Sequence, residues 1–124
     1  MSHKIVLYRK ANGTVPTLDF LEGLKTKQRV KAEYRIDMLR SEGNKLRYPH
    51  SDLVREGIFE LRWEVNTDIF RIMYFFSKDS IVLLNGFQKK DRKTSVEEIE
   101  RAYRYREDYL NRQGGIVYDR RNPV

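Results

Sequence analysis

The segment Ile58–Phe87, IFELRWEVNTDIFRIMYFFSKDSIVLLNGF, contains three strand-like runs separated by two short turns. Every second residue of 58–65 is apolar, which is typical of a strand with one buried face. The runs 69–76 and 81–87 are more apolar and predict more deeply buried strands. Because the turns NTD and KDS are short, the three strands are expected to form an antiparallel meander.

Upstream of the meander, the sequence predicts one strand and two helices. Residues 4–9 are strand-like, and Pro16 opens a short helix over 17–22. A longer helix follows from Thr26 to about residue 41. Its apolar residues recur at nearly helical spacing and predict a core-facing side with Val30, Tyr34 and Met38, and with Ile36 and Leu39 beside them. A further strand is predicted within 47–55, although this run contains Pro49.

Downstream of the meander, Thr94 and Ser95 each precede a glutamate by three residues, and these capping boxes predict a helix that ends near Gln113. Its apolar face is expected to contain Val96, Ile99, Tyr103 and Leu110. Residues 114–124 form a tail that is either a loose arm or an added strand. The chain is therefore predicted to be α+β, with one domain over 1–113: an N-terminal strand, a helical hairpin, a curved antiparallel sheet of about four strands and a C-terminal helix.

The composition narrows the function classes. The 124 residues suit one globular domain, no apolar run reaches the roughly 18 residues of a membrane span, and the N-terminal apolar stretch is too short for a signal peptide. With no cysteine and two histidines, we expect neither a metal centre nor another cofactor, and we expect a cytoplasmic location. The net charge of +7 favours a polyanionic partner.

Three cationic features are predicted to converge. Arg62 and Arg71 lie on neighbouring strands and, by alternation, opposite the apolar face, so they are expected to share one side of the sheet. The run KKDRK over 89–93 leaves the next strand and precedes a helix N-terminus, which adds anion affinity. The hairpin 25–47 carries eight cations against three anions, and its candidate RNA-binding residues are Lys27, Lys31, Arg35 and Arg47.

Each feature also has a structural interpretation. In this interpretation, Arg62 pairs with Glu60 or Glu64 across the surface of the sheet. Arg71, which apolar residues flank, forms a buried ion pair. The KKDRK run is also consistent with a solvated turn, and His50 is interpreted as a loop histidine without a special role. Glu60, Glu64 and Asp91 are carboxylates near the candidate site, but they do not form a pair of hydrolase type.

Arginine and lysine side chains together favour phosphate chemistry. A guanidinium group binds a phosphate through two hydrogen bonds and stabilises the extra charge of a pentavalent transition state. A lysine crowded by other cations has a lowered pKa and becomes a proton acceptor nearer to neutral pH. These properties suit RNA cleavage by the ribose 2′-OH on its own 3′-phosphate, and they equally suit simple phosphate binding.

Four ordered motifs carry a family resemblance. They are LVREGIFELR (53–62), DIFRIMYFF (68–76), IVLLNGFQKKDRKT (81–94) and VEEIERA (96–102). Together they resemble the RelE/HigB toxins, and most closely a phage-derived subgroup with the patterns G-[LI]-[YFW]-E-L-R, Y-R-[VI]-x-Y and GFxKKxxKTP before an EIExA helix. The resemblance spans about residues 8–111.

The resemblance implies the toxin of a type II toxin–antitoxin pair, which cuts mRNA in the ribosomal A site and contacts ribosomal RNA. It also implies a helix-turn-helix antitoxin of the HigA type as partner. By position, the catalytic residues would be Arg62, Arg71, Lys89 and Lys90, with Lys93 as a further candidate. Arg92 and Lys93 of the basic run are also predicted to bind RNA.

The sequence departs from the family at two points. The general pattern has a tyrosine or histidine after the last strand, where this chain has Lys89-Lys90-Asp91-Arg92, and Ser95 stands where the subgroup usually has proline. Two alternatives therefore stay open: a non-catalytic toxin of the same fold that poisons DNA gyrase or binds nucleic acid, and a phosphate-binding module that acts only in a complex.

Overall fold

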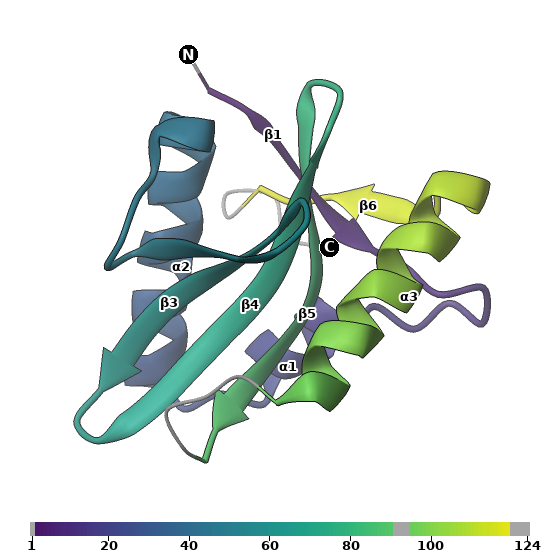
Figure 1. Cartoon of the computed structure of the whole chain (residues 1–124). Coiled ribbons are helices and arrows are strands. Elements are labelled where there is room, and N and C mark those ends of the chain that lie inside the picture. Colours follow the sequence, from purple (N-terminus) through teal and green to yellow (C-terminus); the bar gives the residue numbers. More distant parts are fainter. Residues whose placement is uncertain (1, 91–94, 120–124) are drawn as a thin grey trace.

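The structure is a computed structural model that describes residues 2–90 and 95–119. Its elements, labelled in Figure 1, are β1 (Lys4–Tyr8), α1 (Pro16–Glu22), α2 (Thr26–Glu42), a 3-10 turn η1 (Gly43–Lys45), β2 (Ser51–Arg55), β3 (Ile58–Val65), β4 (Asp68–Ser77), β5 (Ser80–Lys89), α3 (Val96–Arg112) and β6 (Gly115–Val117). The α+β class and the expected order of the main elements are confirmed.

The sheet has six strands in the order β2-β3-β4-β5-β1-β6. The meander β3-β4-β5 is antiparallel as expected, but β1 lies parallel to β5, so the expected antiparallel sheet of about four strands is wrong in strand number and direction. The physical reason is that β5 is buried along most of its length and needs a neighbour on each side. The second neighbour is the short apolar strand β1. The connection through α1 and α2 allows β1 to lie parallel to β5.

Two hydrophobic cores lie on opposite faces of the sheet. On one face, α1 and α2 pack against residues such as Leu61, Phe70 and Ile72. On the other face, α3 packs against residues that include Met73 and Phe75. The helices α2 and α3 accordingly flank the sheet from opposite sides in Figure 1.

The apolar face expected for α2 is correct at Ile36 and Leu39 but wrong at Val30 and Tyr34. Val30 and Tyr34 are 58% and 64% exposed, whereas Ala32, Ile36 and Leu39 are buried. The core-facing side also contains Glu33, whose carboxylate accepts a hydrogen bond from the hydroxyl of Tyr118. Apolar periodicity missed Ala32 and Glu33, because one is a small residue and the other is a carboxylate that is buried with a hydrogen-bond partner.

The face expected for α3 is correct at Ile99, but Val96 and Leu110 are exposed. Ala102 and Tyr109 complete the buried side of this helix, and Tyr103 packs at its margin. Ser95 caps α3, because its hydroxyl accepts a hydrogen bond from the backbone N–H of Glu98 at 3.2 Å. The capping partner predicted at Thr94 lies outside the described residues.

The chain after α3 adds a strand, which is one of the two alternatives that the sequence left open. β6 pairs antiparallel with β1, and the backbone N–H of Tyr118 donates to the carbonyl of Ile5 at 2.9 Å. Arg40 of α2 donates to the carbonyl of Tyr118 at 3.1 Å, so this segment connects the sheet edge to α2. Within residues 2–90 and 95–119, no helix is long and apolar enough to span a membrane.

Candidate functional site

Arg62 of β3 and Arg71 of β4 lie directly opposite each other in the antiparallel pair. Opposite residues of such a pair project from the same face of the sheet, so the two side chains share one side, as the alternation predicts. This is the side on which α3 packs. Met73 and Phe75 follow Arg71 at every second position of β4, so they share its face, and both belong to the α3-side core. The arginines therefore lie on the same side of the sheet as α3.

Glu60 connects the two arginines. Its Oε2 atom lies 2.6 Å from Nη1 of Arg62 and 3.5 Å from Nε of Arg71. Arg71 is 4% exposed, and its Nη1 also donates to the carbonyl of Phe70 at 2.8 Å. The ion pair that the sequence left open for Arg71 is thus present, but one carboxylate serves two guanidinium groups.

The electrostatics of Arg71 reflect this arrangement. Burial lowers the pKa of Arg71, and the neighbouring charge of Arg62 lowers this pKa further, whereas Glu60 and Glu64 oppose the shift. A guanidinium group stays charged in proteins despite such shifts. Arg71 therefore carries a positive charge in a poorly solvated position, where an anion would be strongly attracted.

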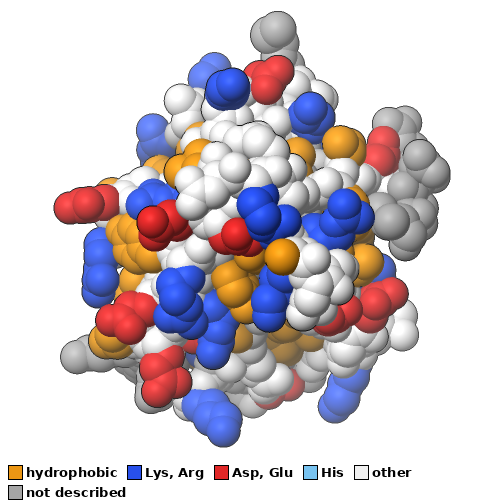
Figure 2. Space-filling view, turned by 90° about the vertical axis from the view of Figure 1, so that its right-hand side faces the viewer, with side chains coloured by type: hydrophobic (Ala, Val, Ile, Leu, Met, Phe, Trp, Pro, Cys, Tyr) orange, Lys and Arg blue, Asp and Glu red, His pale blue; other side chains and the backbone are white. Residues whose placement is uncertain are grey.

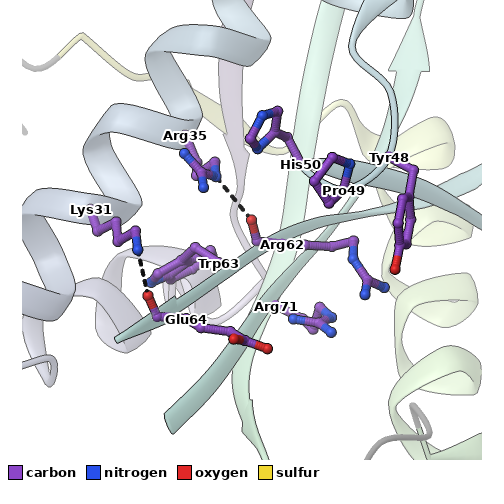
Figure 3. Close-up of a pocket in the computed structure, with 9 residues that line it drawn as sticks. All are labelled: Lys31, Arg35, Tyr48, Pro49, His50, Arg62, Trp63, Glu64 and Arg71. Atoms are coloured by element: carbon purple, nitrogen blue, oxygen red, sulfur yellow. Dashed lines mark hydrogen bonds between the residues drawn. The ribbon is translucent and has the colours of Figure 1, made fainter. Parts of the chain in front are cut away.

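A cavity of about 260 Å³ extends from the arginine pair around the edge of β3. Three separate parts of the chain line it, and Figure 3 shows all nine residues: Lys31 and Arg35 from α2, Tyr48, Pro49 and His50 from the segment before β2, and Arg62, Trp63, Glu64 and Arg71 from the sheet. Four of these side chains are cationic and one is anionic. The cavity is therefore suited to an anionic ligand.

The basic residues of α2 have structural partners at the edge of β3. Because β2 pairs with β3 only as far as Leu61, the following part of this edge has no neighbouring strand. Arg35 Nε donates to the carbonyl of Arg62 at 3.0 Å, and Lys31 Nζ donates to the carbonyl of Glu64 at 2.8 Å (Figure 3). Burial lowers the pKa of Arg35. These two residues fix α2 against the strand that carries Arg62.

The other predicted RNA-binding residues are dispersed. Lys27 is exposed on α2, and Arg47 is exposed and donates to the carbonyl of Asn44. On the side of the molecule that carries α3, cationic and anionic side chains are interspersed, as Figure 2 shows. Arg92 and Lys93 lie outside the described residues.

The predicted lysines are placed differently from each other. Lys89 lies opposite Ile69, which is two residues before Arg71 on β4. Lys89 is therefore on the same face of the sheet as the arginines. It is buried, whereas Lys90 is exposed. Both lysines line a second hollow with Ser95, Glu97 and Glu98 rather than the cavity of Arg62 and Arg71.

The structure adds residues that the sequence did not single out for this cavity. Tyr48 is 68% exposed, and the Cζ atom of Arg62 lies 5.1 Å from the centroid of its ring. His50, interpreted from sequence as a loop histidine, lines the same cavity, and its carbonyl accepts from the backbone N–H of Arg62 at 2.8 Å. No local pattern could have identified them, because only the packing of α2 and β3 brings this segment to the arginines.

Comparison with known proteins gives one family. The family described as "Phage derived protein Gp49-like (DUF891)" matches residues 19–107, which include both arginines, Tyr48 and the whole meander. No curated protein matches the chain.

Proposed function

The chain belongs to the phage-derived Gp49-like family, a family of RelE-like toxins of toxin–antitoxin pairs, and from this membership we propose that it is a ribosome-dependent mRNA endoribonuclease. The observation that carries the proposal is the pairing of Arg62 with Arg71 on one sheet face, with a single carboxylate between them. Glu64 also lies near Arg71, but Lys31 and Arg35 line the same cavity, so cations outnumber carboxylates there and positive charge is left for a phosphate.

The proposed reaction forms a bond between the ribose O2′ and the adjacent phosphorus and breaks the bond between that phosphorus and O5′. The products are a 2′,3′-cyclic phosphate and a 5′-hydroxyl. The 2′-OH loses its proton as it attacks, and the leaving O5′ gains a proton. Arg62 and Arg71 hold the phosphate and stabilise the charge of the pentavalent transition state. Lys89 or Lys90 is proposed to neutralise charge or transfer a proton. Lys89 shares the sheet face of the arginines, although both lysines line the second hollow rather than the arginine cavity.

The test is a translation reaction with purified ribosomes and a defined message, followed by mapping of the RNA ends. The wild-type protein is expected to produce new ends within the reading frame. Arg71→Ala is expected to slow cleavage by about 100-fold or more, as removal of one transition-state donor does in other enzymes. Arg104→Ala, which removes an exposed arginine of α3, is the matched control and is expected to cleave like the wild type.

Intact message at toxin concentrations that stop growth would contradict the proposal. In that case, a DNA-damage response and undiminished toxicity of Arg71→Ala would favour the non-catalytic alternative. We further propose that a HigA-like helix-turn-helix antitoxin neutralises the toxin in the cytoplasm. We then expect a small reading frame beside the gene, whose product co-purifies with this chain and restores translation.

A further inference from the structure

We propose that Tyr48 is a base-stacking residue, which binds a nucleobase of single-stranded RNA next to the phosphate held by Arg62 and Arg71. The inference rests on the proposed function, because it assigns a substrate contact within the same site. It gives a role to a side chain that lies outside the predicted catalytic set.

The first observation is the position of the Tyr48 ring. The ring is 68% exposed although it is large and mostly apolar, and it lines the cavity that contains both arginines. In Figure 3, the Tyr48 ring stands beside the guanidinium group of Arg62, whose Cζ atom is 5.1 Å from the ring centroid. A base that stacks on this ring would therefore have its phosphate within reach of a cation.

The second observation is the fixed backbone that carries the ring. The N–H groups of His50 and Ser51 both donate to the carbonyl of Arg47, at 3.0 and 3.2 Å. The carbonyl of His50 accepts from the N–H of Arg62, and Pro49 restricts the backbone directly after Tyr48. Because this turn is held to β3, binding of a ligand to the ring costs little further backbone conformational entropy.

The third observation concerns the chemistry of single-stranded nucleic acid. Sites for single strands combine cations that contact the backbone with aromatic rings on which bases stack, and stacking tolerates every base because each has a π face. The cavity offers both groups side by side. Within the described residues, the Tyr48 hydroxyl makes no hydrogen bond, so the fold uses neither its donor nor its acceptor. Tyr48→Phe can therefore remove the hydroxyl without breaking a described contact, so this variant tests the ring separately from the hydroxyl.

The experiment measures binding of two oligonucleotides by fluorescence anisotropy at low salt. One is a short single-stranded RNA made uncleavable by 2′-deoxy substitution, and the other has the same length and phosphates but no bases. Wild-type protein is expected to prefer the oligonucleotide with bases. Tyr48→Ala is expected to weaken that binding by about 5- to 100-fold and to leave binding of the abasic strand unchanged.

Two further variants separate the ring from other roles. Tyr48→Phe keeps the π face and is expected to bind within about twofold of the wild type, since stacking does not need the hydroxyl. Tyr34→Ala removes an equally exposed tyrosine that does not line the cavity, and it is expected to bind normally. Thermal unfolding of each variant, followed by circular dichroism, shows whether the fold is retained.

Several results would overturn the inference. They are equal binding of the two oligonucleotides by the wild type, an equal loss for both strands in Tyr48→Ala, and a loss in Tyr48→Phe as large as that in Tyr48→Ala. The cleavage assay on ribosomes is independent of these measurements. Base-dependent binding without cleavage would remove the proposed enzyme activity but keep the stacking role, whereas cleavage without base dependence would do the opposite.

Discussion

Glu60 lies between two guanidinium groups and is itself 5% exposed. Two buried or half-buried cations so close together would repel each other in a poorly solvated environment, and the carboxylate offsets this repulsion. In the proposed phosphate site, Glu60 would hold the arginines in place while leaving part of their charge available to a ligand.

We therefore predict that Glu60→Gln lowers the free energy of unfolding by roughly 3 kcal/mol, because it leaves a buried charge without its counter-ion. Urea denaturation followed by circular dichroism measures the change. Glu64→Gln is the matched control on the same strand and face, and its exposed carboxylate should contribute less than about 0.5 kcal/mol. Equal stability of Glu60→Gln and wild type would show that the carboxylate does not stabilise the pair.

At the scale of elements, α1 contacts the sheet where β5 has a glycine. A Cβ atom added at Gly86 would lie 2.2 Å from Cδ2 of Phe20 and 2.6 Å from Cε2. The Phe20 ring cannot withdraw easily, because it packs against Trp63 and Phe70, with ring centroids 6.1 and 6.5 Å away. Gly86 thus allows α1 to sit close to the strand that leads to Lys89.

We predict that Gly86→Ala destabilises the protein by about 1–3 kcal/mol, as overpacking of a filled core does. Gly23→Ala is the control, since its added Cβ atom would meet backbone oxygens at an ordinary 3.6 Å. Thermal or urea unfolding of both variants tests the prediction. If Gly86→Ala is as stable as Gly23→Ala, α1 does not pack against β5 as described.

At the scale of the whole molecule, three buried tyrosines join separate elements. Tyr118 donates to Glu33 of α2, Tyr8 of β1 donates to Asp108 of α3 at 2.5 Å, and Tyr74 of β4 shares a hydrogen bond with Ser51 of β2. Burial, and for Tyr8 and Tyr118 also the hydrogen bond to a carboxylate, raises the pKa of each phenol to about 12.

The folded state therefore favours the neutral phenol at these positions. Because each pKa is raised above its ordinary value near 10, the stabilisation is complete below about pH 10 and is lost as the pH rises towards 12. We predict two steps in the ultraviolet titration of tyrosinate, with the second step coinciding with unfolding. Tyr118→Phe should make the alkaline loss of stability shallower, whereas Tyr34→Phe should not. Ionisation of all eight tyrosines in one step near pH 10, with the chain still folded, would contradict this assignment.

The local pattern of the chain was sufficient for most of its elements, whereas it left β6 undecided. Alternation in 58–65 predicted β3 with its observed bounds, and the capping sequence at Ser95 predicted the start of α3. These features depend on residues adjacent in sequence, since strand alternation and helix capping are short-range effects. For the same reason, Arg62 and Arg71 could be placed on one face from alternation alone.

Only the tertiary structure decided which elements are neighbours in space. Three features join residues far apart in the chain. They are the parallel pairing of β1 with β5, the burial of Glu33 in place of Val30 and Tyr34, and the approach of Tyr48 to Arg62. Such contacts are selected by the burial of whole faces and by partners for buried polar groups, which depend on the complete packing. The sequence alone thus determined the strands, helices and charges, whereas packing determined which of those charges share a cavity.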